Sequence, residues 1–398
     1  MFETEIISII TTFLYVLYAI YVFIYHRESI IGIAVTFFYA VISIYSTYLV
    51  ISGAISPVAP ISLLSSIYIF ICFVVLSRPL NGIKLCINDK NCDILYYGDY
   101  LIIICNIYIL VSILYEISYG VKSVNNYLSG NWLSIYYEMR GDNAIYYSSF
   151  YEKLLINFVN YIRIPALISA FILFIKKRKY ILLPIALLAP FITALTNAIY
   201  ISSRSDLFLI TLQYGFIFMF FIEYFNKKQI YIASTVGLSV ILIAYIVSSL
   251  ITGSRFADDY TSSWVQGYFG DPQFTGNIIV TYTDSFYKGG YIAKNLYSYL
   301  GISGGQYHMP IDIGFSFQTL IATRFKDFGY VGTIVYLLVL TTIVKHMISG
   351  ELTIAKLYII QIYFSAVIIG CFYEINNDIT FIMILIIYYL LKNKHLRI

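Results

Sequence analysis

The chain has 398 residues, of which 60% are hydrophobic and only 12% are charged. A soluble domain carries about 25% charged residues, so this composition excludes a soluble enzyme of the same size. The abundant apolar surface also excludes a disordered chain. We therefore expect a polytopic membrane protein, built as one transmembrane helical domain over residues 1–398.

Stretches long and apolar enough for a membrane helix, about 20 residues each, recur along the whole chain. They are continuously apolar and do not alternate, so they predict helices and not the strands of a closed barrel. The predicted fold class is all-α, with about 11 transmembrane helices. In chain order the stretches cover roughly residues 6–25, 30–50, 61–80, 100–119, 154–175, 180–201, 207–225, 230–251, 328–348, 353–372 and 378–391.

Lysine and arginine in the short connections predict the orientation, because such connections lie on the cytoplasmic side. The cluster at 176–179 (Lys-Lys-Arg-Lys) is taken as cytoplasmic. Counting helices outward from it places every short basic connection on that same side. The N-terminus, with Glu3 and Glu5, is then exterior and the C-terminus cytoplasmic. The net charge of +4 reflects this topology and does not indicate a nucleic-acid partner.

Two connections on the exterior side are long, at about 120–153 and about 252–327. Loops of that length are usually functional when they are ordered. The first contains Arg140. The second is the largest polar block of the chain and is also rich in tyrosine and phenylalanine, so we expect it to form a small, partly helical cap. The alternative is a disordered loop.

Tyrosine is unusually frequent, with 42 residues against 2 tryptophans. Tyrosine suits the membrane–water interface and wet cavities inside a membrane, because its ring is apolar and its hydroxyl is polar. A biased codon composition explains the same count, so the tyrosines alone assign no function.

Two arginines stand where a predicted exterior loop meets a helix. Arg204 lies between serines in Ser-Ser-Arg-Ser-Asp, and Arg255 follows Gly253 and Ser254. Together they predict an anion clamp, because a guanidinium binds phosphate oxygens with two hydrogen bonds. The alternatives for Arg204 are a side chain that reaches the lipid head groups and a pair with Asp206.

A histidine in the second long loop is the candidate base. His308 follows Tyr307 in a glycine-rich stretch, and it is the one histidine outside the cytoplasmic connections. A neutral histidine near an anion clamp is suited to general-base catalysis. The alternative is a histidine that is only hydrogen-bonded within its loop.

Two further arginines are candidates for substrate binding, and so are four residues of the long loops, Arg140, Asp258, Tyr307 and Asp312. Arg163 lies inside a predicted span, where its charge is costly unless it meets an anion or a water-filled cavity. Arg324 stands just before Asp327, and Gly329 and Gly332 follow at a spacing that permits close helix approach.

The sequence contains no phosphate-binding loop and no dinucleotide fingerprint, and its five cysteines match no zinc pattern. We therefore expect no cofactor and no metal.

With these features together, the chain resembles the Wzy-type O-antigen polymerases of bacterial inner membranes. These polymerases of oligosaccharide repeat units have about a dozen spans and two enlarged periplasmic loops with essential arginines. A recurring family pattern is arginine, ten residues, then glycine. Arg204 and Gly215 match it, whereas Arg255 and Gly267 are separated by eleven residues. The resemblance implies a GT-C-like, O-antigen ligase/polymerase-like fold.

The resemblance implies a glycosyltransferase acting at the periplasmic face for O-antigen or capsule synthesis. It moves a growing glycan from undecaprenyl diphosphate to the non-reducing end of a new lipid-linked repeat unit. Arg204 and Arg255, with Arg324 or Arg140, meet the charge of the diphosphate. His308 is the first candidate base, and Asp258 or Asp312 the next. Membrane lipid and a chain-length regulator protein are the further partners.

Two other functions remain open. An O-antigen ligase shares the layout and differs in its acceptor. A flippase or other transporter of lipid-linked oligosaccharides should show paired halves, cations along a central cavity and shorter loops, and this sequence shows no paired halves.

Overall fold

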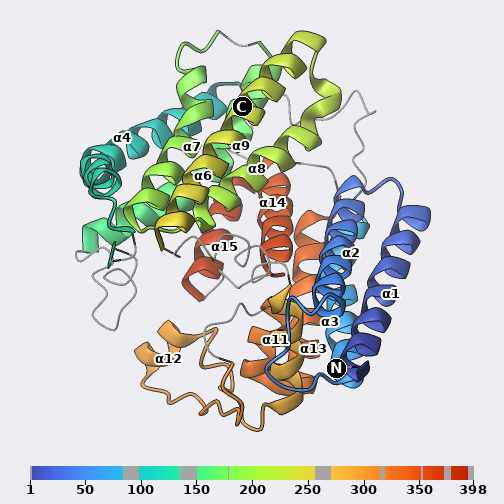
Figure 1. Cartoon of the computed structure of the whole chain (residues 1–398). Helices are drawn as coiled ribbons and strands as arrows, with labels where there is room; N and C mark the ends of the chain where they lie inside the picture. Colours follow the sequence, from blue (N-terminus) through green and yellow to red (C-terminus); the bar gives the residue numbers. More distant parts are fainter. Residues whose placement is uncertain are drawn as a thin grey trace. The chain divides into compact units, whose positions relative to one another are not determined.

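The computed structural model describes residues 2–83, 98–132, 134–135, 150–177, 179–255, 270–313, 319–350, 353–371 and 378–392 (Figure 1). These residues are predominantly α-helical, which confirms the predicted all-α fold for this part of the chain. Their one pairing of β type is an isolated antiparallel bridge between Ser285 and His308.

The helices follow one another in the order labelled in Figure 1. They are α1 (Phe2–Tyr25), α2 (Ile30–Ile51), α3 (Leu63–Asn81), α4 (Gly98–Ser129), α6 (Phe150–Ile175), α7 (Leu183–Tyr200), α8 (Ser205–Phe221), the 3-10 turn η2 (Ile222–Tyr224), α9 (Lys227–Arg255), α11 (Asp271–Tyr282), α12 (Lys294–Leu300), α13 (Leu320–Ile348), α14 (Ile354–Ile369) and α15 (Asp378–Lys392).

Nine helices in the described ranges are long and apolar enough to cross a membrane, namely α1–α4, α6–α9 and α13. They coincide with the first nine predicted spans. The last two predicted spans correspond to α14 and to Phe381–Lys392, which are apolar but shorter. At 1.5 Å per residue, a 16-residue helix such as α14 extends about 24 Å, less than a bilayer core of about 30 Å. The count of eleven stays a prediction.

Large apolar side chains are exposed along the long helices. On α9, Leu238 is 67% exposed, Leu242 58% and Tyr245 66%. Contiguous apolar surface of this kind is rare on soluble monomers and marks contact with a membrane or a partner. Together with the nine long helices, it is the pattern of a multi-pass membrane protein.

The chain divides into two compact units, each described here by itself. The first comprises Met1–Cys86, Ser262–Gly350 and Ile362–Met383, and so contains α1–α3 and α11–α13. The second comprises Ile87–Thr261, Glu351–Gln361 and Ile384–Ile398, and contains α4 and α6–α9. The single transmembrane domain expected from the sequence stays a prediction.

In the first unit, the short helix α11 is buried between longer helices, and Asn277 fixes it to the start of α3. The Asn277 side chain donates to the Ser62 carbonyl (2.7 Å) and to Ser66 Oγ (2.8 Å), and it accepts from the Ser62 N–H (2.8 Å). Twelve residues extend only about 18 Å, so α11 is too short to span a bilayer by itself. The end of α11 thereby becomes a fixed starting point for the segment that follows it.

Helix α13 changes direction at Gly329, whose φ of 66° and ψ of −165° are not helical. A side chain there would lie about 3.1 Å from the ring of Phe286, so both the backbone angle and the packing require glycine. The helix begins at Leu320, earlier than the predicted span at 328. Arg324 and Asp327 are therefore helical and buried instead of lying in the long loop.

Candidate functional site

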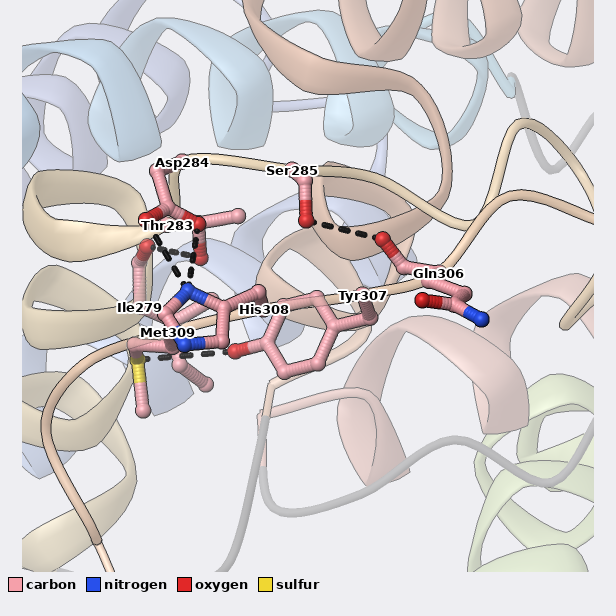
Figure 2. A network of polar contacts seen from close by, with 8 residues as sticks. All are labelled: Ile279, Thr283, Asp284, Ser285, Gln306, Tyr307, His308 and Met309. Atoms are coloured by element: carbon pink, nitrogen blue, oxygen red, sulfur yellow. Dashed lines mark hydrogen bonds and ion pairs between the residues drawn. The ribbon is translucent and has the colours of Figure 1, made fainter.

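A histidine–aspartate pair lies after α11, in the first unit (Figure 2). The chain leaves α11 at Thr283 in an extended conformation. It then runs antiparallel to the segment around His308, with Asp284 N–H donating to the His308 carbonyl and His308 N–H donating to the Ser285 carbonyl, both at 3.3 Å. This short pairing brings the two side chains together although they are 24 residues apart.

The pairing orients the imidazole. His308 Nδ1 lies 2.9 Å from both carboxylate oxygens of Asp284. In the neutral ring, Nδ1 carries the proton that is donated to the Asp284 carboxylate. Nε2 then carries the lone pair that can accept a proton. The side chains are 64% and 57% exposed, so a substrate hydroxyl can reach them. This is the geometry of a base held by an orienting group.

Asp284 was not recognised from the sequence as a partner of His308. It is one acid among several in the second long loop, and its spacing from the histidine corresponds to no periodicity. The weak signal available was the apolar stretch ending at Tyr282, which places Asp284 directly after a helix.

Tyr307, predicted to bind substrate, is half-buried beside this pair. Its ring stacks on Tyr287 at 5.2 Å between centroids, its hydroxyl donates to Met309 Sδ at 3.4 Å, and Lys326 Nζ lies 4.7 Å from the ring centroid. Burial raises the pKa of the Tyr307 phenol, and Asp284 contributes in the same direction. The phenol therefore stays protonated near neutral pH and can donate a hydrogen bond.

One glycine pair and a third glycine hold the segment before His308 against the segment after Asp284. The Cα atoms of Gly290 and Gly304 approach so closely that a side chain on either would lie about 3 Å from the other's backbone. A side chain on Gly305 would overlap the carbonyl oxygen of Phe286, and Gly305 N–H donates to the Tyr287 carbonyl at 2.8 Å. These contacts keep the segment of His308 against the segment of Asp284.

Gly305→Ala is therefore expected to lower the free energy of unfolding by about 1–3 kcal/mol, the usual range for an overpacked site. The thermal unfolding midpoint of the purified protein in detergent measures it. The control is Gly237→Ala in α9, where a side chain meets nothing within 4 Å and alanine should stabilise the helix slightly. Equal midpoints for the two variants would contradict the role of the glycine contact.

Arg324 and Asp327 form a buried ion pair beneath the same segment. Arg324 Nη1 lies 3.2 Å from Asp327 Oδ2, and the two side chains are 1% and 0% exposed. Asp327 also accepts from the backbone N–H groups of Tyr291 (2.9 Å) and Ile292 (3.1 Å). The ring of Tyr336 lies 5.2 Å from the guanidinium carbon. Arg324 thus holds the backbone at Tyr291 and Ile292 through Asp327, while its role in substrate binding stays a prediction.

The other predicted residues of the second long loop and its surroundings are distributed differently. Asp312 is exposed in the segment after His308. Arg255 is the last residue of α9, and its side chain is not described. Arg140 and Asp258 lie outside the described residues.

Arg204 precedes the first turn of α8, in the second unit, and is half-buried. Its neighbours Ser203 and Ser205 join their hydroxyls at 2.9 Å. The Asp206 carboxylate accepts a hydrogen bond from the Asn197 side chain of α7, which gives Asp206 a partner other than the arginine. Acidic side chains are stabilised at a helix N-terminus, where the helix dipole is positive. The role of Arg204 in an anion clamp stays a prediction.

Arg163 lies inside α6 and is 2% exposed. An arginine at the centre of a membrane helix costs about 3 kcal/mol on insertion scales, so such a residue is a candidate functional site. Its Nε–H is buried and has no hydrogen-bond partner among the described residues. Arg163 and Arg204 belong to the second unit, and His308 and Arg324 to the first. A joint site of all four stays a prediction.

No family model, no curated protein and no solved structure matches the chain. Among the described residues, no three histidine, cysteine or acidic side chains gather in a way that could hold a metal ion.

Proposed function

We propose that the protein is a membrane glycosyltransferase that polymerises lipid-linked oligosaccharide repeat units. The observation that carries this proposal is the His308–Asp284 pair, an oriented and accessible base in a chain of long apolar helices. A base of this kind suits the deprotonation of a sugar hydroxyl, and the apolar helices suit a donor that stays in the membrane.

The proposed reaction is a transfer from a lipid diphosphate. His308 Nε2 takes the proton of an acceptor hydroxyl, whose oxygen forms a bond to the anomeric carbon of the growing glycan. The bond from that carbon to the diphosphate breaks, and undecaprenyl diphosphate leaves. Arg204, together with Arg255, stabilises the negative charge that develops on the leaving group. The broken diphosphate linkage supplies the free energy, so no nucleotide is required.

We also propose where the protein is located in the cell. The basic short connections favour a bacterial inner membrane protein with its N-terminus in the periplasm and its C-terminus in the cytoplasm. The His308 segment then faces the periplasm. The products are chains for O-antigen or capsule, and a chain-length regulator protein is the proposed partner.

The proposal is tested with purified protein in detergent and a synthetic undecaprenyl-diphosphate-linked repeat unit as the substrate. We expect the wild type to form a ladder of extended chains. Arg204→Ala should lower the rate by about 10²–10³-fold, the usual effect of removing one group that stabilises developing charge. The matched control is Arg78→Ala, at an exposed arginine in the last turn of α3.

A wild-type rate of extension in Arg204→Ala would contradict the clamp. Deletion of the gene distinguishes polymerase from ligase, because loss of a polymerase leaves a single capped repeat unit and loss of a ligase leaves none. An unchanged chain distribution in the deletion strain would contradict both.

A further inference from the structure

The most unusual buried group of the second unit is the guanidinium of Arg163. Arginine carries five N–H donors and cannot lose its charge inside a protein. At 2% exposure the side chain is removed from water, and its Nε–H meets no acceptor among the described residues. Buried polar groups without partners are rare in proteins and indicate a ligand, an ion or an ordered water.

Helices α4, α7 and α8, which pack against α6, carry buried hydroxyl groups. The charge of Arg163 acts on the phenols of Tyr108 in α4 and Tyr214 in α8. The Tyr108 hydroxyl pairs with Thr193 Oγ1 of α7 at 3.0 Å, and the Tyr214 hydroxyl donates to the Leu187 carbonyl. Helices α4, α7 and α8 thus pack against α6 with polar but neutral groups, which do not supply the missing negative charge.

The carboxyl of Glu116 on α4 has a partner on another helix. Glu116 stands two helical turns beyond Tyr108 on α4, and Thr196 of α7 donates to its Oε2 at 2.8 Å. Its other oxygen, Oε1, is buried without a partner within the described part of the chain. The carboxyl therefore does not supply the acceptor that the Nε–H of Arg163 lacks.

A row of polar side chains leads away from Arg163 along two packed helices. On α4 it consists of residues spaced by three or four positions, which share one helix face. On α7 the matching positions are Asn197 and Tyr200, and Asn197 accepts from Tyr115 at 3.2 Å. The buried members on α4 are Tyr108, Ser112, Tyr115, Tyr119 and Ser123. The row runs toward the helix ends that the orientation prediction places outside.

We propose that Arg163 is the centre of a phosphate-binding site inside the helices α4, α6, α7 and α8. A phosphate group offers several acceptor oxygens and negative charge, which match the fork of the guanidinium. A cation would be repelled, and an apolar ligand would leave the Nε–H without an acceptor. The phosphate comes from a polyprenyl lipid headgroup or from free phosphate. Its assignment to a polyprenyl lipid rests on the proposed function, whereas the phosphate site itself does not.

The test uses purified full-length protein in detergent with three probes: radiolabelled undecaprenyl phosphate, radiolabelled undecaprenol and inorganic phosphate as a competitor. The wild type should bind the lipid phosphate at least about tenfold more tightly than the uncharged alcohol, the ratio expected for a charge-assisted contact. Arg163→Gln should remove this ratio, and Arg163→Lys should restore part of it. Arg78→Gln is the matched control and should bind as the wild type does.

Competition by inorganic phosphate assigns the site to free phosphate, and its failure to compete assigns the site to the lipid. The inference is overturned if the wild type binds undecaprenyl phosphate and undecaprenol equally well. It is also overturned if Arg163→Gln keeps the wild-type ratio of the two affinities. If Arg163→Gln is not monodisperse, the wild-type ratio and Arg163→Lys still decide the outcome. Chain extension is measured in the same preparations. If the wild type prefers the lipid phosphate to the alcohol but extends no chains, only the proposed function is contradicted. If it extends chains but shows no such preference, only the phosphate site is contradicted.

Discussion

His308→Gln should lower the rate of chain extension by about 10²–10⁴-fold, the usual contribution of a general base. Glutamine keeps a polar side chain of similar reach but cannot take a proton. The measurement is the initial rate of extension with purified protein and saturating lipid-linked repeat units. His346→Gln, at an exposed histidine in the last turn of α13, is the matched control and should extend chains at the wild-type rate.

A substitution of Asp284, the partner of His308, gives a second test of the same base. Asp284→Asn keeps the shape of the side chain but removes the charge that holds the Nδ1 proton of His308. We expect a fall in kcat with little change in KM, because an orienting group acts on the chemical step and not on substrate binding. A wild-type kcat in both His308→Gln and Asp284→Asn would remove the base from the mechanism.

Asp327→Ala should lower the free energy of unfolding by about 3–5 kcal/mol, because it leaves the buried guanidinium of Arg324 without its carboxylate. It also removes the acceptor for the N–H groups of Tyr291 and Ile292. A loss of that size is a large fraction of the stability of a typical domain. Denaturant titration in detergent micelles measures it.

The double variant Arg324→Met with Asp327→Leu tests the reason for that loss. Replacing a whole buried pair by apolar side chains is often neutral, whereas breaking it is not. The double variant should therefore be more stable than Asp327→Ala alone. Glu223→Ala, at an exposed acid, is the control for loss of a carboxylate. If the double variant is the less stable of the two, the pair does not act through charge compensation.

The positions of the long helices follow from the sequence because the signal is local. A membrane-spanning helix needs about 20 apolar residues in a row, and every residue of the run contributes to it. The nine predicted spans from 6–25 to 328–348 correspond to nine helices of the structure. The start of α13 differs because the charges of Arg324 and Asp327 make this stretch resemble a loop, whereas in the structure they compensate one another.

The exceptional residues were also visible in the sequence, but their partners were not. A single arginine inside an apolar run identifies Arg163, and a single histidine in a long polar loop identifies His308. Their surroundings come from other helices and from other segments of the chain. Asp284 meets His308, and Tyr108 of α4 meets Thr193 of α7 beside the helix of Arg163, through tertiary packing that no spacing in the chain encodes.

The sequence by itself determined that this chain is all-α, apolar and built from long helices, because hydropathy is additive along the chain. Only the tertiary structure decided which polar groups neutralise one another. It joined Arg324 to Asp327, set Asp284 behind His308 and left the Nε–H of Arg163 without an acceptor among the described residues. The reason is physical: a charge inside a membrane protein depends on its neighbours in space, and those neighbours come from distant parts of the sequence.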